Sequence, residues 1–136
     1  MRKTAVLLIF LGFIACKSRF ERAELFHENG TPKVVGVYHL DEDTVRVGEK
    51  HFYPDSNLRM IAYYDDSGKR KDKWTYFYEN GELWSSCEYS GGLKHGESIV
   101  YYPNGQVRYS GKYEMDRPVS GSFKYYNEKG ALIRTE

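Results

Sequence analysis

The sequence has few cysteines, almost no net charge and a single long hydrophobic run. Two cysteines in 136 residues leave no disulfide framework. Twenty Lys and Arg nearly balance 19 Asp and Glu, for a formal net charge of +1, so no global field steers the chain toward nucleic acid or an anionic surface. A chain of this length is expected to form one domain. Any charged contact must therefore come from a local patch.

The hydrophobic run covers residues 5–15 and is too short to cross a bilayer as a helix. It follows Arg2 and Lys3, an arrangement typical of an export signal. The end of the run, Phe13-Ile14-Ala15-Cys16, resembles the lipobox of bacterial lipoproteins, in which the cysteine is acylated and becomes the first residue. Several acyl chains anchor a protein stably, at about 0.8 kcal/mol per buried CH₂.

This resemblance implies a lipoprotein signal peptide over residues 1–15, a lipidated Cys16 with a short polar tether over 16–22, and a domain over 23–136. It also implies a lipid-anchored protein of the bacterial cell envelope. Lys17 favours the outer membrane, by resemblance to lipoprotein sorting rules. The alternatives are an ordinary secretory signal cleaved nearby and an uncleaved anchor.

Composition favours β-structure. The chain contains 13 Tyr, 7 Phe and 2 Trp, and aromatic residues suit pleated, half-buried surfaces. Thirteen glycines supply turns. This aromatic content argues against disorder.

A repeat runs through the chain with a period of about 25 residues. Its turn positions are Gly30, Ser56, Gly81, Gly105 and Gly130, at spacings of 26, 25, 24 and 25 residues. The side chain four residues before each turn position is aromatic, and the side chain two residues after it is mostly aliphatic. Six residues after the turn it is small, and eight after it is tyrosine: Tyr38, Tyr64, Tyr89 and Tyr113. Even offsets share one face of a strand, so these columns predict one buried face.

Each turn predicts a hairpin. In Pro103-Asn104-Gly105 the glycine suits the left-handed position of a three-residue loop with a bulge, which places Tyr101 across from Val107. Ser56 would be strained there by about 1 kcal/mol, and a shift of that turn to Asn57 is the alternative. Stacking such hairpins gives an all-β fold, an elongated antiparallel sheet stabilised by contacts between neighbours.

Three phrases, SGKY, GSFKYYNEKG and the Tyr-x-Asn-Gly turn, resemble the MORN repeat variant of bacterial proteins. The resemblance covers residues 23–136, with a degenerate first unit and a partial last one. It implies stacked hairpins that act as protein-interaction or dimerising scaffolds. Some related arrays are linked to membrane lipids and some carry antitoxin-like labels. The chain has no room for an accompanying catalytic domain.

Motifs for chemistry are absent from the sequence. The four histidines, His27, His39, His51 and His95, show no paired spacing for a metal site and are predicted at the surface or in turns. Cys87 falls in the column of small residues, which favours packing over reactivity. The segment SGGLKHGES lacks the Gly-Lys-Ser/Thr ending of a phosphate loop. We therefore expect no metal, no cofactor and no enzymatic activity.

Two features remain as a candidate interaction surface. Lys69, Arg70, Lys71 and Lys73 form a basic link between two hairpins, which is either a contact for lipid headgroups or an acidic partner, or a solvated loop. Tyr63 and Trp84 occupy odd offsets, opposite the apolar columns, where they are either interaction anchors or covered by neighbours. The sequence thus predicts an envelope lipoprotein that binds an unknown protein partner and no nucleic acid. A glycan- or lipid-headgroup-binding module and an antitoxin-like neutralising partner are the alternatives.

Overall fold

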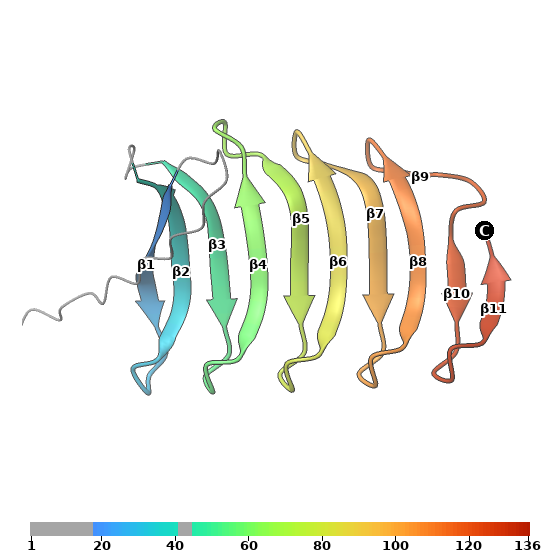
Figure 1. Cartoon of the computed structure of the whole chain (residues 1–136), viewed down its shortest axis with the longest axis horizontal. Helices are drawn as coiled ribbons and strands as arrows, with labels where there is room; N and C mark the ends of the chain where they lie inside the picture. Colours follow the sequence, from blue (N-terminus) through green and yellow to red (C-terminus); the bar gives the residue numbers. More distant parts are fainter. Residues whose placement is uncertain (1–17, 41–44) are drawn as a thin grey trace, which may run out of the picture.

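The structure, a computed structural model, describes residues 18–40 and 45–136. These residues form one open antiparallel sheet of stacked hairpins, as predicted (Figure 1). The predicted signal peptide over 1–15 and Cys16 lie outside the described residues. Residues 19–22, which the sequence predicts as part of a tether, belong instead to the first strand.

The strands follow one another in chain order across the sheet, and the short β9 pairs with β8 beside this path. Their bounds are β1 Arg19–Phe26, β2 Pro32–His39, β3 Arg46–Phe52, β4 Leu58–Tyr64, β5 Arg70–Phe77, β6 Leu83–Ser90, β7 Leu93–Tyr101, β8 Val107–Glu114, β9 Arg117–Pro118, β10 Lys124–Tyr126 and β11 Leu132–Thr135.

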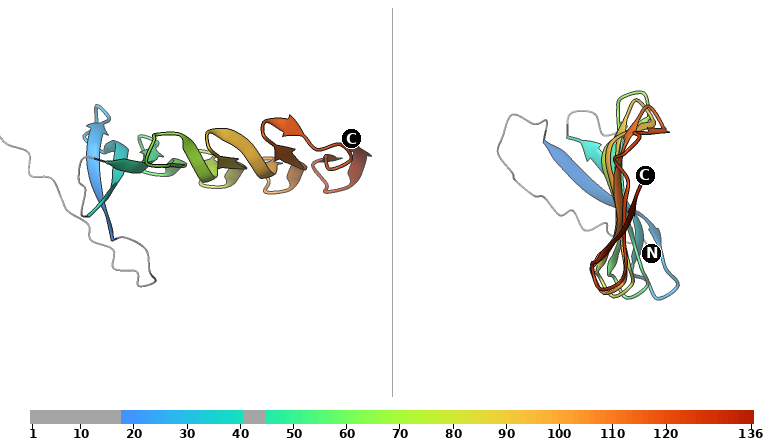
Figure 2. Two further views of the ribbon diagram at one scale, coloured as in Figure 1. Left: turned by 90° about the horizontal axis from the view of Figure 1, so that it is seen from above. Right: turned by 90° about the vertical axis from the view of Figure 1, so that its right-hand side faces the viewer.

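The sheet is a single layer. Seen from above and from its end, no second layer covers either face among the described strands (Figure 2). Strands β1 and β2 cross the direction of the last strands at an angle, which is the accumulated twist expected of a long sheet. Each hairpin therefore contacts only its neighbours, so the stability of the array is a sum over adjacent pairs.

The hairpin turns adopt the predicted geometry and all lie along one edge (Figure 1). Gly30, Gly81, Gly105 and Gly130 have φ between +80° and +86°. Ser56 itself takes the left-handed position, with φ +71°, so the alternative shift to Asn57 is wrong. Asn57 is held in place by its side-chain amide, which donates to the Glu79 carbonyl of the next hairpin at 2.9 Å.

A bulge three residues after each turn changes which side chains share a face. In the hairpin β7–β8 Val100 pairs with Tyr109 and Tyr101 pairs with Val107, so Arg108 is an extra residue. Because Val100 and Tyr101 are consecutive on a strand, they point to opposite faces, and so do their partners. The expectation that all even offsets share one face is therefore wrong, although Tyr101 does lie across from Val107 as predicted.

The same bulge recurs in all five hairpins. The extra residues are Lys33, Arg59, Trp84, Arg108 and Ile133. Each bulge separates the column at offset two from the columns at offsets six and eight. The sheet consequently has two apolar faces instead of one.

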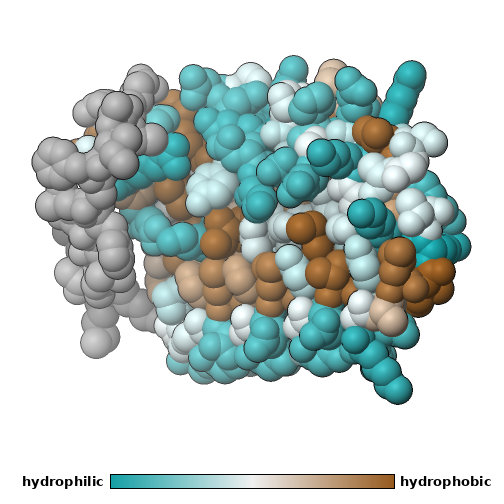
Figure 3. All heavy atoms as spheres, turned by 45° about the vertical axis from the view of Figure 1, so that its right-hand side comes forward, coloured by the Kyte–Doolittle hydropathy of each residue, from teal (hydrophilic) through white to brown (hydrophobic). Residues whose placement is uncertain are grey.

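We call the side that carries Tyr38, Tyr64, Tyr89 and Tyr113 the tyrosine face. The opposite side, the leucine face, carries the pairs next to the turns, which are Phe26–Pro32, Phe52–Leu58, Phe77–Leu83, Tyr101–Val107 and Tyr126–Leu132. Figure 3 shows hydrophobic residues gathered in a band that crosses the strands just above the turns.

The core is thin and lies mostly in β2 and in the column of small residues. Ala62 is fully buried and Gly111 is buried, whereas Cys87 is half-buried and faces Trp74 across the strand pair. His39 is 9% exposed within β2, so the prediction that the histidines lie at the surface or in turns is wrong for this residue. Both faces of β2 are buried, since Val34 to His39 is a continuous buried run.

A repeated side-chain hydrogen bond ties each hairpin to the next. The side chain three residues before each turn residue is hydrogen-bonded to a backbone carbonyl of the following hairpin. That carbonyl belongs to the aromatic residue four before the next turn residue. The pairs are His27 to Phe52 at 2.9 Å, Tyr53 to Phe77 at 3.0 Å, Tyr78 to Tyr101 at 2.9 Å and Tyr102 to Tyr126 at 3.0 Å. This column, which the sequence comparison overlooked, fixes the spacing of the turns.

Removing one of these hydrogen bonds should cost about 1 kcal/mol of unfolding free energy. We expect this loss for Tyr78→Phe, measured by urea denaturation, because the Tyr101 carbonyl loses its donor while the ring stays. The matched control is Tyr101→Phe, since Phe26, Phe52 and Phe77 already occupy that place in other hairpins. Equal losses for the two variants would contradict this role.

Candidate functional site

Tyrosines and cations alternate from strand to strand along the tyrosine face. Tyr38 pairs with Arg46, Tyr64 with Arg70, and Tyr89 with Lys94. The alternation continues to Tyr113, which pairs with Pro118 instead of a cation. We call this line of side chains, one from each of strands β2 to β8, the aromatic–cation row. Strands lie about 4.8 Å apart, so successive cations are separated by about 9.6 Å.

Arg70 and Lys94 each rest on the tyrosine ring of the next strand, within their own hairpin. The guanidinium carbon of Arg70 lies 4.5 Å from the centre of the Tyr89 ring and 5.7 Å from that of Trp74. Lys94 Nζ lies 4.8 Å from the centre of the Tyr113 ring. A cation held over an aromatic ring is stabilised by roughly 0.5–1 kcal/mol at a partly exposed site. These contacts order side chains that would otherwise be mobile.

The rings also pack against one another. Trp74 meets Tyr64 edge-on, with ring centres 5.4 Å apart, and Tyr89 at 5.5 Å. The Trp74 indole N–H donates to the Tyr63 carbonyl at 3.0 Å. Trp74 thus lies beside the row on β5 and joins the rings of β4 and β6.

Charge divides the row into two parts. Arg46 forms ion pairs with Glu24 at 2.8 Å and with Glu49 at 2.9 Å. Arg70 and Lys94 form no ion pair with any carboxylate in residues 18–40 and 45–136. The row is therefore neutralised near β3, and its cations without an ion pair among these described residues lie on β5 and β7, where Asp72 is the register partner of Tyr89 on the same face.

Tyr64 is held in its neutral form. Burial, together with the hydrogen bond that its hydroxyl donates to the Glu49 carboxylate at 2.8 Å, raises the pKa of Tyr64 from 10.0 to about 12. Burial also raises the pKa values of Tyr76 and Tyr89. Burial thus favours the neutral phenol at Tyr64, Tyr76 and Tyr89.

Stability should fall as the pH rises from 10 to 12. In that window the unfolded chain loses the Tyr64 proton before the folded chain does, so deprotonation favours unfolding. Denaturation midpoints measured between pH 8 and pH 12 should show this decline. The midpoint should fall less steeply with pH in Tyr64→Phe than in the wild-type protein. Tyr63→Phe serves as the control and should keep the wild-type slope. A slope that does not change in Tyr64→Phe would show that another group governs it.

The two aromatics predicted as a shared surface lie on opposite faces. Trp84 is the bulge residue of its hairpin, is 45% exposed, and its ring lies 5.9 Å from that of Tyr76 and 6.0 Å from that of Tyr78. It therefore belongs to the tyrosine face. Tyr63 is half-buried and pairs with Lys71 on the leucine face. The bulge accounts for this separation.

The predicted basic link is also divided. Lys69 lies in the turn before β5, and the side chains of that strand alternate, so Arg70 joins the tyrosine face while Lys71 and Lys73 point to the leucine face. The four cations consequently form no single patch.

The repeats of this sheet were compared with known families. Residues 73–90 and 94–115 match the family model of the MORN repeat variant. This match supports membership of the MORN-repeat family. No curated protein sequence matches the chain. The two matched segments lie in β5–β6 and β7–β8; Lys94 is the first residue of the second segment, and Arg70 stands three residues before the first.

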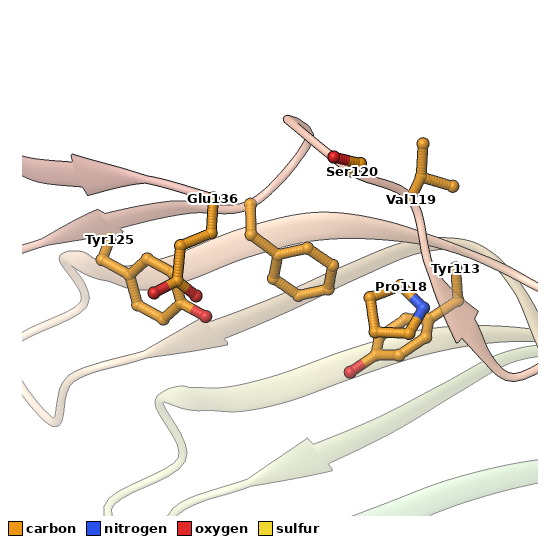
Figure 4. A pocket seen from close by; sticks show the side chains of 7 residues that line it. Tyr113, Pro118, Val119, Ser120, Tyr125 and Glu136 are labelled. Atoms are coloured by element: carbon orange, nitrogen blue, oxygen red, sulfur yellow. The ribbon is translucent and has the colours of Figure 1, made fainter.

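Beside β8, on the tyrosine face, lies a shallow pocket of about 200 Å³. It is lined by Tyr113, Pro118, Val119, Phe123, Tyr125 and Glu136, and Figure 4 shows Pro118 lying against Tyr113. The pocket thus stands where the aromatic–cation row would place its next cation.

Sequence reasoning found the tyrosine column and named Arg70 within the basic link, but it missed Arg46 and Lys94 and the column that the three cations form. Arg46, Arg70 and Lys94 stand 10, 11 and 11 residues before their turn residues Ser56, Gly81 and Gly105. Aligning the first strand of each repeat as closely as the second would reveal this column.

In the described part of the chain no three His, Cys, Asp or Glu side chains gather as a metal site would require. Nor do these residues include a helix long and apolar enough to cross a membrane.

Proposed function

We propose that this chain is a non-catalytic protein-interaction scaffold and that its tyrosine face binds the partner. The observation that supports this proposal is an uncovered sheet face bearing Trp84, 45% exposed, in contact with Tyr76 and Tyr78. Rigid aromatic side chains on an ordered surface are the usual anchors of protein interfaces, because they bury large areas at little entropic cost.

Site-specific crosslinking tests this proposal. A photocrosslinking phenylalanine derivative at position 84 of the full chain should capture a protein from envelope extracts. The same derivative at position 73 is the control, because Lys73 is exposed on the leucine face. Capture of glycan or lipid alone at position 84, or equal protein capture at both positions, would contradict the proposal.

We also propose that Cys16 carries lipid and holds the scaffold at the outer membrane of a bacterial envelope. The support is the sequence of residues 1–16, with two cations, a short apolar run and a lipobox-like ending. In detergent-phase partitioning, Cys16→Ala should move the protein to the aqueous phase, because single hydrophobic segments of this length anchor weakly compared with several acyl chains. Unchanged partitioning would exclude the lipid anchor.

A further inference from the structure

We propose that the part of the aromatic–cation row between β4 and β8 binds an acidic, proline-rich segment in the polyproline II conformation, with one carboxylate every third residue. This inference rests on the proposed scaffold function and specifies the chemistry of the partner. It follows from the period, the charge and the ring packing of the row.

The period of the row matches that of a polyproline II helix. Arg70 and Lys94 lie on β5 and β7, two strands apart, which is about 9.6 Å across the sheet. A polyproline II helix repeats every three residues with a rise of about 3.1 Å per residue, or about 9.3 Å per turn. A carboxylate at every third residue therefore meets one cation after another while the segment runs across the strands.

The two cations without ion pairs in the described part of the chain favour an anionic occupant, and Asp72, which pairs with Tyr89 on the same face, leaves the guanidinium of Arg70 without a salt bridge. Neither Arg70 nor Lys94 has an ion-pair partner among the described residues, and Arg70 is exposed. Arg46 is already neutralised by Glu24 and Glu49, so the acidic segment engages β5 and β7 and has no unpaired cation to meet at β3. Charge-assisted hydrogen bonds from a guanidinium or ammonium group would fix its register.

The packing of the rings favours proline over sugar. Arg70 covers one side of the Tyr89 ring and Lys94 covers one side of the Tyr113 ring. Flat stacking of a sugar requires open ring faces, whereas proline rings fit between aromatic ridges, as in the aromatic-lined grooves that recognise polyproline II segments. Such a segment is also ordered before it binds, which lowers the entropic cost of association.

Beside β8 the aromatic–cation row ends in apolar side chains, which suit an apolar residue at one end of the bound segment. Beyond Lys94 the next place in the row is Pro118, which pairs with Tyr113 and lines the pocket with Phe123 (Figure 4). A segment that crosses β5 and β7 would therefore place an apolar residue, and no carboxylate, at this end.

Labelled synthetic peptides test the inference with the full chain, by fluorescence anisotropy. The probe is a peptide of six Glu-Pro-Pro units. One control keeps its composition but changes the spacing to Glu-Glu-Pro-Pro-Pro-Pro, another keeps the charge spacing in flexible Glu-Gly-Gly units, and a third reverses the charge with Lys-Pro-Pro. We expect the probe to bind at least about fivefold more tightly than each control, and more weakly at high salt.

Substitutions then locate the site. Arg70→Gln and Lys94→Gln should each weaken binding of the probe by roughly three- to tenfold, and the double variant more. Lys71→Gln and Lys73→Gln remove the same charge from the leucine face and should change the affinity less than about twofold. Circular dichroism of each variant verifies that the sheet is intact.

Each other outcome overturns the inference. Equal binding of the two Glu/Pro peptides would refute the period match, and equal losses in Arg70→Gln and Lys71→Gln would show unspecific attraction. If the probe does not bind but position 84 still captures a protein, the inference fails while the scaffold proposal stands. If an acidic polysaccharide binds in place of the peptide and position 84 captures no protein, both fail.

Discussion

Replacing Trp74 with alanine should lower the free energy of unfolding by about 3–5 kcal/mol, the usual cost of removing a buried tryptophan. Trp74 is only 9% exposed, and its ring contacts those of Tyr64 and Tyr89. It also donates the hydrogen bond to the Tyr63 carbonyl. Because a single-layer sheet has little other core, neighbouring side chains have few atoms with which to refill the cavity.

Chemical denaturation of the full chain measures this loss, which is a large part of the 5–15 kcal/mol typical of a domain. The matched control is Trp84→Ala, the same substitution at a residue that is 45% exposed, with an expected loss below about 1.5 kcal/mol. Trp74→Phe keeps an aromatic ring and should fall between the two. Similar losses in Trp74→Ala and Trp84→Ala would show that the row contributes little to stability.

The second large effect is expected from adding a single methyl group at Gly111. A Cβ placed there would lie 2.6 Å from two atoms of the Phe123 ring. That ring cannot move away easily, because the Phe123 backbone is fixed by two hydrogen bonds. Its N–H donates to the Glu136 carbonyl, and its carbonyl accepts from the Glu136 N–H. Gly111→Ala should therefore cost about 1–3 kcal/mol through overpacking.

A double-mutant cycle identifies the cause of that loss. In a Phe123→Ala background the added methyl group meets empty space, so Gly111→Ala should cost little. Additive losses would instead point to the backbone of β8 as the origin of the effect. Thermal or urea denaturation of the four proteins provides the measurement.

The repeat itself could be predicted from the sequence because turns and periods are local. Tyr101 lies opposite Val107, and the four turn glycines take positive φ, as the Pro-Asn-Gly chemistry indicates. Ser56 was harder to predict, because its side chain disfavours the positive φ that it adopts, while its N–H donates the turn hydrogen bond to the Tyr53 carbonyl at 3.0 Å.

The bulge after each turn could not be predicted from residue types. Its positions carry Lys33, Arg59, Trp84, Arg108 and Ile133, which share neither size nor polarity. One inserted residue nevertheless exchanges the faces of everything that follows it on the strand. This exchange is why a pattern with one buried face becomes a sheet with two apolar faces.

The candidate site was only half visible in the sequence for a different reason. The tyrosine column lies eight residues after each turn residue, whereas the cations are displaced when they are counted from these tyrosines, because links of varying length intervene. Only counting back from the next turn, by 10 or 11 residues, aligns them. The spacings from tyrosine to cation are 8, 6 and 5 residues for Tyr38–Arg46, Tyr64–Arg70 and Tyr89–Lys94. Strand pairing removes this variation, because it aligns residues by hydrogen bonds and not by count.

The hydrogen bond that joins each hairpin to the next also makes the units interchangeable. Donor and acceptor sit at the same places in successive repeats, so a hairpin can follow any other without a new interface. Duplication of one unit within the chain would add two strands, about 9.6 Å of sheet, and one more tyrosine–cation step. Recombination between neighbouring copies can thus lengthen or shorten the tyrosine face by whole repeats, while the types of side chain that it presents stay the same.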